Sequence, residues 1–409
     1  MLDIKFIREN KEKVKKGVVA KQLDPKLVDK VLELDGKRLD LLQEIEELRA
    51  KRNKLAKDKD IEGGRKLKKE LQTKEPALKK IGEKYQEALF QIPNLPADDV
   101  PVGKDESENK VLRKVGKPEK LSFKARDHLE LGEALDIIDV KRAAKVSGTR
   151  FGYLKGDAVL LEFALVNFAL ETLIKEGFTP LVTPVLIKKD AMRAMGYLEH
   201  GGEEDMYVFE KDGLVLVGTS EQAIGPMHMN EIFELKDLPK KYVGFSACFR
   251  REAGTYGKDT RGIMRLHQFD KVEMFSFVKP QDSDKEHKYL LSLQEKLFKA
   301  LEIPYQVVEM CTGDLGAPAA RKYDLEAWMP GQGKYREVTS ASNATDFQAR
   351  RLNIKYQDKG KTGYVHTLNG TAFAIGRTII AILENYQQKD GSVEIPKVLQ
   401  KWIGKEKII

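Results

Sequence analysis

Residues 245–277 read FSACFRREAGTYGKDTRGIMRLHQFDKVEMFSF, and their period-two alternation predicts a long β-hairpin. One face of its second arm carries charges among aromatic rings: Phe269, Lys271, Glu273 and Phe275. A core face does not bury unpaired charges, so this face is either a solvated, salt-bridged surface or a binding face for a charged, flat ligand. The long basic loop at residues 253–265 favours the ligand, because loops of this length are usually functional.

Length and composition set broad limits. With 409 residues the chain is expected to hold two or three domains, one of them with a substantial core. It has no apolar run of eighteen residues and no secretory hydrophobic segment at its N-terminus, so we expect a cytoplasmic protein with no membrane partner. Cys248 and Cys311 form no CxxC pair, which argues against a disulfide framework and against zinc. Cys248 is expected to be a small core residue.

The first quarter of the chain shows helical heptad spacing. Apolar or long side chains recur at alternating steps of four and three over residues 27–58 and again over residues 65–92. Gly63 and Gly64 are expected to reverse the chain between these segments, so that two helices pack antiparallel as a projecting coiled-coil arm. Pro76 lies inside the second helix and is expected to kink it.

Charge is distributed unevenly along this arm. The net charge of the chain is +8, and residues 49–84 hold fourteen Lys or Arg against six Asp or Glu, a surplus equal to that of the whole chain. A basic excess confined to one segment favours a polyanion as the partner. A solvated coiled coil used for dimerisation remains the alternative, because Lys-rich helices are often simply soluble.

A change of composition predicts a domain boundary. Residues 92–109 contain three prolines and an acidic tail, which is typical of a linker. We therefore expect an N-terminal domain at residues 1–108 and a second domain at residues 109–409. In the second domain short apolar runs alternate with helical patterns.

A helix followed by a proline-containing strand is predicted early in the second domain. The helix covers residues 157–175 and is stopped by Gly177. The strand that follows, at residues 178–187, contains Pro180 and Pro184. Proline cannot donate to a β-ladder, so this segment is expected to be either an ordinary edge strand or a strand at an interface.

Four motifs, in order, resemble those of bacterial-type seryl-tRNA synthetases, which are class II aminoacyl-tRNA synthetases. FRREAG at 249–254, with TRG at 260–262 and RLHQF at 265–269, is similar to motif 2. Residues 177–184 are similar to motif 1, and LNGTAFAIGR at 368–377 is similar to motif 3. The TSE segment at 219–221 also matches. The arm is similar as well, so the resemblance covers nearly the whole chain.

This resemblance implies a fold, an activity and partners. The fold would be α+β, an antiparallel coiled-coil arm followed by a catalytic domain built on a mainly antiparallel β-sheet flanked by helices. The activity would be that of a serine–tRNA ligase, which activates L-serine with ATP and Mg²⁺ to seryl-adenylate and transfers serine to the 3′ end of tRNA(Ser). The arm would bind the tRNA, and motif 1 would form a homodimer. Whether tRNA(Sec) is a second substrate stays open.

The resemblance also implies roles for individual residues. Around serine it places Thr219, Ser220, Glu221, Arg250, Glu273 and Thr371. Around ATP it places Arg250, Arg251, Glu252, Arg265, Phe269, Glu337, Val338, Thr339, Ser340 and Arg377. The catalytic residues among them would be Arg250, Glu273 and Arg377, and the Mg²⁺ ligands would be Glu337 and Ser340.

The residues themselves bear on these roles. Thr219 or Ser220 could instead cap a helix that begins at Glu221. Arg377 lies in an otherwise apolar helix, where it must meet an anion. Glu273 has no obvious partner in the sequence and is expected to meet the serine ammonium.

The chain departs from the common bacterial pattern at Thr371, where that pattern has Ser, and at Phe373 and Ala374. Threonine keeps the hydroxyl of serine at this position, and its extra methyl group narrows the pocket.

Two rival functions remain: a relative that loads a carrier protein, and a non-catalytic nucleic-acid adaptor. The intact basic arm argues against the first rival, and the presence of the ligand residues argues against the second.

Overall fold

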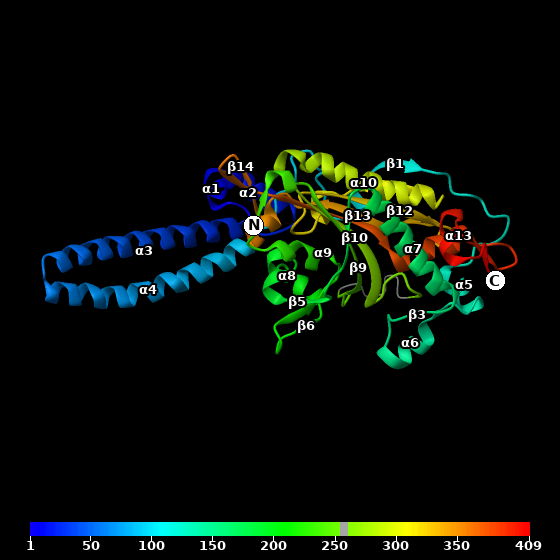
Figure 1. Cartoon of the computed structure of the whole chain (residues 1–409), viewed down its shortest axis with the longest axis horizontal. Coiled ribbons are helices and arrows are strands. Elements are labelled where there is room, and N and C mark those ends of the chain that lie inside the picture. Colours follow the sequence, from blue (N-terminus) through cyan, green and yellow to red (C-terminus); the bar gives the residue numbers. More distant parts are fainter. Residues whose placement is uncertain (254–260) are drawn as a thin grey trace. The chain divides into compact units, whose positions relative to one another are not determined.

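The computed structural model describes residues 1–253 and 261–409, so residues 254–260 of the predicted hairpin loop lie outside the described part. The chain separates into two compact units, Met1–Leu95 and Pro96–Ile409 (Figure 1). Within the described residues, no helix is both long enough and apolar enough to cross a lipid bilayer.

The N-terminal unit is a helical hairpin with a small base. Its helices are α1 (Ile4–Glu9), α2 (Lys11–Ala20), α3 (Lys26–Lys57) and α4 (Ile61–Phe90). α3 and α4 run antiparallel, as the heptad spacing predicts (Figure 1). The predicted reversal at Gly63 and Gly64 is wrong, because both glycines lie in the first turn of α4. The turn comes earlier, at residues 58–60, where Lys59 has a φ of 57° and Asp60 caps α4 by accepting the Gly63 N–H.

Contacts between the two long helices change along the arm. Near the base, apolar side chains are buried together: Val14, Val18, Val28, Val31 and Leu89. Further out, ion pairs join the helices, with Lys74 Nζ 2.6 Å from Glu44 Oε2 and an Arg49 guanidinium nitrogen 2.7 Å from Glu75 Oε1. Ile45 and Leu71 also remain buried in this part, so a narrow apolar seam continues along the arm and the exposed ion pairs add only about 0–1 kcal/mol each.

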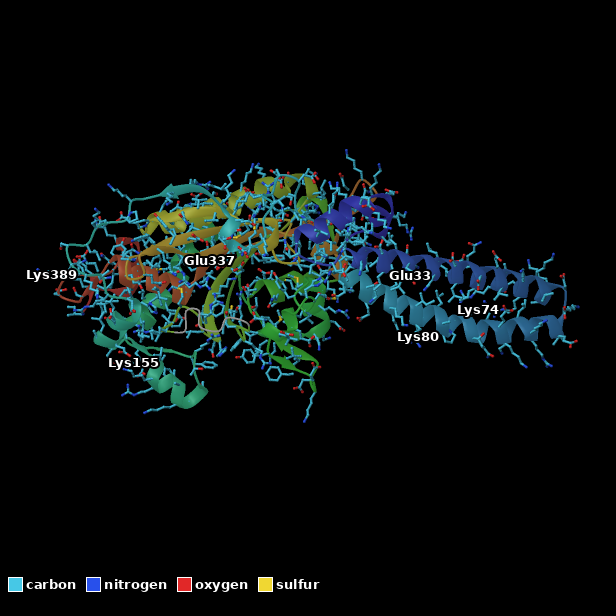
Figure 2. All side chains as sticks on the ribbon, turned by 180° about the vertical axis from the view of Figure 1, so that it is seen from behind. Glu33, Lys74, Lys80, Lys155, Glu337 and Lys389 are labelled. Atoms are coloured by element: carbon cyan, nitrogen blue, oxygen red, sulfur yellow. The ribbon has the colours of Figure 1, made fainter. Side chains whose placement is uncertain are left out.

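The outer arm is highly charged. Figure 2 shows side chains projecting from both helices into solvent, with Lys74 and Lys80 on α4 and Glu33 on α3. α4 continues through Pro76 as one helix, so the proline does not end it. The arm therefore presents long, flexible charged side chains on a continuous helical support.

The C-terminal unit is built on an eight-stranded sheet in the order β1-β11-β12-β13-β16-β10-β9-β4. In that order the strands are β1 (Lys110–Val115), β11 (Tyr305–Glu309), β12 (Arg321–Met329), β13 (Lys334–Asn343), β16 (His366–Ala374), β10 (Gln268–Val278), β9 (Lys240–Phe249) and β4 (Thr179–Val182). All neighbours are antiparallel except β4 and β9. β9 and β10 are the two arms of the predicted hairpin. The prediction of an α+β fold with a mainly antiparallel sheet is confirmed.

The three longest helices of this unit cover one face of this sheet, and shorter helices pack on part of the other (Figure 1). α7 (Asp157–Lys175), α10 (Ser283–Ala300) and α12 (Ile375–Asn385) share the main hydrophobic core with Val272 and Met274 of β10. Because side chains alternate along a strand, Lys271 and Glu273 point to the opposite face. Cys248 is fully buried in β9, as predicted, and burial raises the pKa of its thiol to about 11.

Smaller elements complete this unit. The remaining α-helices are α5 (His128–Ala134), α6 (Val140–Ser147), α8 (Lys189–Met195), α9 (Glu221–Ile224), α11 (Phe347–Leu352) and α13 (Lys397–Ile403). The remaining strands are β2 (Ile138–Asp139), β3 (Tyr153–Leu154), β5 (Leu186–Lys188), β6 (Val208–Phe209), β7 (Leu214–Leu216), β8 (Ile232–Glu234), β14 (Lys355–Asp358), β15 (Lys361–Tyr364), β17 (Val393–Glu394) and β18 (Lys407–Ile408). They form small sheets of two or three strands.

β4 is the last strand of the large sheet, which confirms the predicted edge position of the Pro180 segment. α7 ends at Lys175 as predicted, and Gly177 follows with a φ of 86°. Large apolar side chains on α7 and in the next segment are exposed: Leu160, Phe163, Ile174, Val182 and Leu186. Val182 is 86% exposed, although its β-branched side chain would be more stable when covered. These exposed groups fit the predicted homodimer surface.

We therefore predict that Val182→Lys weakens the dimer by at least about tenfold in Kd, because the interface would have to bury an unpaired ammonium. Static light scattering at micromolar concentration measures the change. Val146→Lys is the matched control, since Val146 is also exposed, at 72%, but lies on α6. A monomeric unsubstituted chain, or equal weakening by both substitutions, contradicts the prediction.

Candidate active site

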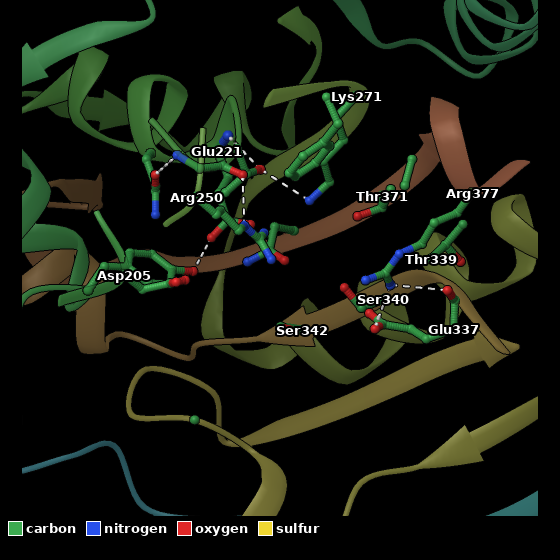
Figure 3. A pocket seen from close by; sticks show the side chains of 18 of the residues that line it. Asp205, Glu221, Arg250, Lys271, Glu337, Thr339, Ser340, Ser342, Thr371 and Arg377 are labelled. Atoms are coloured by element: carbon green, nitrogen blue, oxygen red, sulfur yellow. Dashed lines mark hydrogen bonds and ion pairs between the residues drawn. The ribbon is translucent and has the colours of Figure 1, made fainter. Parts of the chain in front are cut away.

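A cavity of about 340 Å³ opens on the sheet face opposite α7, α10 and α12. Residues far apart in the sequence meet in it. The predicted site residues that line it are Thr219, Glu221, Arg250, Glu252, Arg265, Phe269, Glu337, Val338, Thr339, Ser340, Thr371 and Arg377. Figure 3 shows Glu221, Arg250 and Lys271 on one side, and Glu337, Ser340 and Arg377 on the other.

A β-bulge brings Glu337 and Ser340 to the same face of β13. The register between β12 and β13 shifts where Glu326 pairs with Glu337 and Leu325 pairs with Thr339, so Val338 is the extra residue. Strict alternation would send residues 337 and 340 to opposite faces, and the bulge reverses this. Val338 and Thr339 also border the cavity, but both are almost fully buried.

Arg377 meets an anion, as its place in an apolar helix predicts. Its guanidinium donates to the Glu337 carboxylate at 2.8 Å and to the Glu337 backbone carbonyl at 3.1 Å. Burial raises the pKa of Glu337, but Arg377 and Lys322 outweigh burial and lower it to about 2. Glu337 is therefore ionised at neutral pH. Among the described residues no cluster of three His, Cys, Asp or Glu side chains could hold a metal ion.

The first strand of the hairpin ends at the other wall of the cavity. Arg250 follows β9, lies over the Phe269 ring at 5.5 Å and donates to the Gly218 carbonyl at 3.3 Å. Arg265 donates to the Glu252 carboxylate at 2.7 Å. Two arginines and an aromatic ring thus face the cavity from the hairpin, which confirms that this face is not a plain solvated surface.

Two carboxyl groups are buried at the inner end. Glu221 is 4% exposed, and the Tyr197 hydroxyl donates to its carboxylate. Burial first, and then the charge of Glu273, raise the pKa of Glu221 to about 7. Glu273 is 1% exposed and lies behind the lining residues.

The expectation that Glu273 has no partner within the chain is wrong. Its Oε2 accepts the Thr371 hydroxyl at 2.8 Å and lies 2.8 Å from Lys271 Nζ. Lys271 in turn donates to Thr219 Oγ1 at 3.3 Å. A buried carboxylate is costly unless it is paired, and these partners come from β10 itself and from its neighbour β16.

Two further predicted residues lie outside the cavity. Ser220 is fully buried and its hydroxyl donates to the Gly244 carbonyl at 3.3 Å. Arg251 is exposed and its guanidinium lies 5.8 Å from the Tyr207 ring, in a neighbouring depression. Thr219 Oγ1 accepts the Glu221 N–H at a long 3.4 Å, and Ser220 makes no side-chain cap, so helix capping is at most a minor role for this turn.

Two residues at this site were not predicted from the sequence, and a third, Lys271, was placed on the charged face of the hairpin without a role. Tyr197 lies in the segment after α8, where no periodic pattern marks it. Lys322, on β12, is close enough to Glu337 to lower its pKa. Lys271 was visible in the alternation of β10, but nothing in the sequence indicated its contacts with Thr219 and Glu273.

The cavity therefore has two chemical ends. One end holds carboxylates near a tyrosine hydroxyl and suits an ammonium group. The other end and the hairpin wall hold Arg250, Arg265 and Arg377, whose planar guanidinium groups suit carboxylate and phosphate oxygens. A small zwitterion and a polyanion could bind side by side.

The chain also matches known families and proteins. Residues 1–96 match the model of the seryl-tRNA synthetase N-terminal domain, and residues 207–386 match that of the tRNA synthetase class II core domain (G, H, P, S and T). The serine–tRNA ligase of Dictyoglomus thermophilum is 48% identical over 418 residues, covering 99% of this chain and 98% of that protein.

Solved structures are similar over the full length. Seryl-tRNA synthetase from Pyrococcus horikoshii, complexed with ATP, superimposes with a TM-score of 0.94 at 45% identity, covering 100% of this chain and 99% of that one. The cytoplasmic serine–tRNA ligase of Naegleria fowleri, in complex with AMP, gives 0.91 at 34% identity, with 100% and 98% covered. This chain belongs to the seryl-tRNA synthetase family of class II aminoacyl-tRNA synthetases.

Proposed function

We propose that this chain joins L-serine to ATP, releases pyrophosphate and transfers the seryl group to the 3′ end of tRNA(Ser). The two-ended charge pattern of the cavity is the observation that carries the proposal. Serine is a zwitterion and ATP is a polyanion. The two must bind so that the serine carboxylate is aligned for in-line attack on the α-phosphate of ATP. The full-length similarity to serine–tRNA ligases supports the same conclusion.

In the activation step the serine carboxylate attacks the α-phosphorus, and the bond to the pyrophosphate oxygen breaks. Negative charge spreads over the phosphoryl oxygens in the transition state, and fixed cations stabilise it. Arg250 is suited to the α-phosphate and the serine carboxylate, because it lies between the hairpin wall and Gly218. Arg265 and Arg377 are suited to the γ-phosphate end, and the adenine would lie against Phe269 with its exocyclic amine near Glu252.

Glu337 and Ser340 would hold Mg²⁺ together with phosphate oxygens of ATP. The donor set fits, because the bulge places an ionised carboxylate and a hydroxyl on the same face, and Mg²⁺ prefers oxygen ligands while keeping several from phosphates and water. The bound ion would neutralise phosphate charge. Arg377 contacts Glu337, so it would lie beside the same phosphates.

Serine selection would use the inner end of the cavity. Glu221 and Glu273 attract the ammonium group, and Thr371 offers its hydroxyl to the substrate hydroxyl. A site built to hydrogen-bond that hydroxyl rejects alanine by about 10⁴-fold, because a buried partner would be left unpaired. Threonine must be excluded by fit alone, and the methyl group of Thr371 narrows the space available.

The N-terminal arm would recognise the tRNA. A basic helical rod contacts backbone phosphates over a long distance more readily than it reads three base edges. The surplus of fourteen basic over six acidic side chains at residues 49–84 lies on α3, on α4 and in the turn between them. Seryl tRNAs carry a long variable arm, as the family resemblance implies, and such a rod can lie along it.

Serine-dependent exchange of pyrophosphate into ATP, followed by charging of tRNA(Ser), tests the proposed function. Both reactions are expected, and exchange is expected without tRNA. Exchange with serine but no charging would favour a relative that loads another carrier. Absence of both reactions would favour a non-catalytic nucleic-acid adaptor.

We predict that Glu273→Gln lowers kcat/KM for serine in pyrophosphate exchange by at least about tenfold, because it removes a negative charge that attracts the ammonium group. Glu286→Gln is the matched control. Glu286 is also buried, accepts a hydroxyl hydrogen bond from Ser276 at 2.8 Å and lies 3.7 Å from Lys241 Nζ, away from the cavity. Exchange within about threefold of the unsubstituted chain would disprove the role of Glu273.

The raised pKa of Glu221 predicts a pH dependence. Only ionised Glu221 attracts the ammonium, so kcat/KM for serine should fall as the pH drops below about 7. The hydrogen bond from Tyr197 lowers this pKa, so Tyr197→Phe should move the midpoint to higher pH. Tyr305→Phe removes a hydroxyl that donates to Glu295 at 3.0 Å outside the cavity and should leave the midpoint in place. An unchanged midpoint in Tyr197→Phe contradicts the assignment.

Shortening the arm should separate the two reactions. Replacing residues 45–73 by a short Gly-Ser turn joins two points that already lie close, because Lys74 contacts Glu44. Pyrophosphate exchange should stay within about twofold, while charging of tRNA(Ser) falls by about 100-fold or more and binding by the full-length chain weakens steeply with salt. Replacing the anticodon of tRNA(Ser) should have little effect. Near-normal charging by the shortened chain would show that the arm is not the recognition element.

A further inference from the structure

The large sheet opens between two of its central strands. β13 and β16 pair at three positions, Ala341 with Gly370, Ser342 with Asn369 and Asn343 with Leu368. The next residues toward the cavity, Ser340 and Thr371, are not paired with each other. Ser340 pairs with Asp324 of β12 instead, and Thr371 pairs with Glu273 of β10. The outer edges of both strands thus stay in the sheet while their facing edges separate.

One side chain fills this opening. Gln294 of α10 is fully buried, and its Nε2 donates to the Ser340 carbonyl at 2.7 Å and to the Thr371 carbonyl at 2.9 Å. A buried carbonyl without a hydrogen bond is costly, so the amide replaces the rung that the ladder lacks here. A single NH₂ group spans the gap, so its two hydrogen-bond distances determine how far apart the two carbonyls lie.

The position of Gln294 is itself fixed. α10 makes two other contacts with β13: His287 Nε2 lies 2.9 Å from the Ala341 carbonyl, and the Ser283 hydroxyl donates to Asn343 at 3.1 Å. Burial lowers the pKa of His287 to about 4, so the neutral ring donates this hydrogen bond. Gly370 borders the amide, where an added Cβ would lie 3.4 Å from Gln294 Nε2 and 3.3 Å from Met274 Cε.

We propose that Gln294 is a positioning residue that sets the separation between the strand carrying Glu337 and Ser340 and the strand carrying Thr371. This inference rests on the proposed function, in which the first strand holds the nucleotide and the second contacts serine. The amide touches neither substrate. It aligns the two binding halves from behind the sheet, and a displacement of about 1 Å between reacting groups can cost about 100-fold in rate.

The test compares two buried glutamines. Gln294→Met keeps the side-chain length and removes the donor. Gln387→Met is the control, because Gln387 is also buried and its Nε2 donates to two carbonyls, Arg126 at 3.1 Å and Glu384 at 2.9 Å, away from the cavity. Thermal unfolding, pyrophosphate exchange and the ratio of kcat/KM for serine to that for threonine are measured for both variants.

Gln294→Met is expected to lower kcat for exchange by about tenfold or more and to reduce the serine-to-threonine ratio, with an unfolding midpoint no lower than that of Gln387→Met. Gln387→Met should keep both kinetic quantities within about twofold. A purely structural role would lower stability in both variants and leave the ratio unchanged, which would overturn the proposal.

Gln294→Asn keeps the amide but is shorter by one methylene, so it cannot reach both carbonyls. This variant takes the place of Gln294→Met in the test if the methionine variant does not fold. An intermediate loss of kcat and of the ratio is expected, and unchanged values in this variant would also overturn the proposal. Lack of serine-dependent exchange in the unsubstituted chain would refute the proposed function together with this role, whereas normal exchange in the Gln294 variants refutes the role of Gln294 alone.

Discussion

Pairing of charges on one face of an antiparallel sheet is the constraint on which the catalytic unit depends. Charged side chains point from β10 and β13 to the face that the long helices leave uncovered, and each finds a partner of opposite charge. Glu273 pairs with Lys271, and Glu337 pairs with Arg377. Removing a charge from water is costly unless a partner compensates, so these pairs allow charges on one part of this face. Phe275 and Phe277, further along the same face, pack with α8, α9 and α11, and the longer helices pack against the opposite face.

The same arrangement suits charged substrates. In the proposed function, serine brings an ammonium group to the end that holds the carboxylates of Glu221 and Glu273, and ATP brings phosphates to the arginines of the hairpin wall and of the other end. Each substrate therefore meets fixed opposite charges that need little reorganisation when it binds. The buried carboxylate of Glu221 is held by the hydroxyl of Tyr197, and the amide of Gln294 is held by two backbone carbonyls.

The arm is stabilised in a different way from the catalytic unit. Its base is held by a cluster of buried apolar side chains, and its outer part by a narrow apolar seam that includes the buried Ile45 and Leu71, with exposed ion pairs beside it. The charged surface is therefore carried on two helices that need no large core. Local spacing is sufficient to form such a structure, because i to i+3 and i to i+4 neighbours make the seam. The catalytic unit instead depends on contacts between residues hundreds of positions apart, such as those of Gln294.

Local patterns in the sequence were enough for the hairpin strands, the helix at Asp157–Lys175, the edge position of Pro180 and the antiparallel arm, since each follows from a short period or from the chemistry of one residue. The resemblance to a family supplied the names of most cavity residues. Three features of the site do not follow from side-chain alternation along the strands and were decided by the tertiary structure. The bulge at Val338 brings Glu337 beside Ser340, and Arg251 points out of the cavity. Glu273 pairs with Lys271 and Thr371. Strand register, bulges and buried hydrogen bonds are set by the neighbouring strand or helix, so they take form only when distant segments pack together.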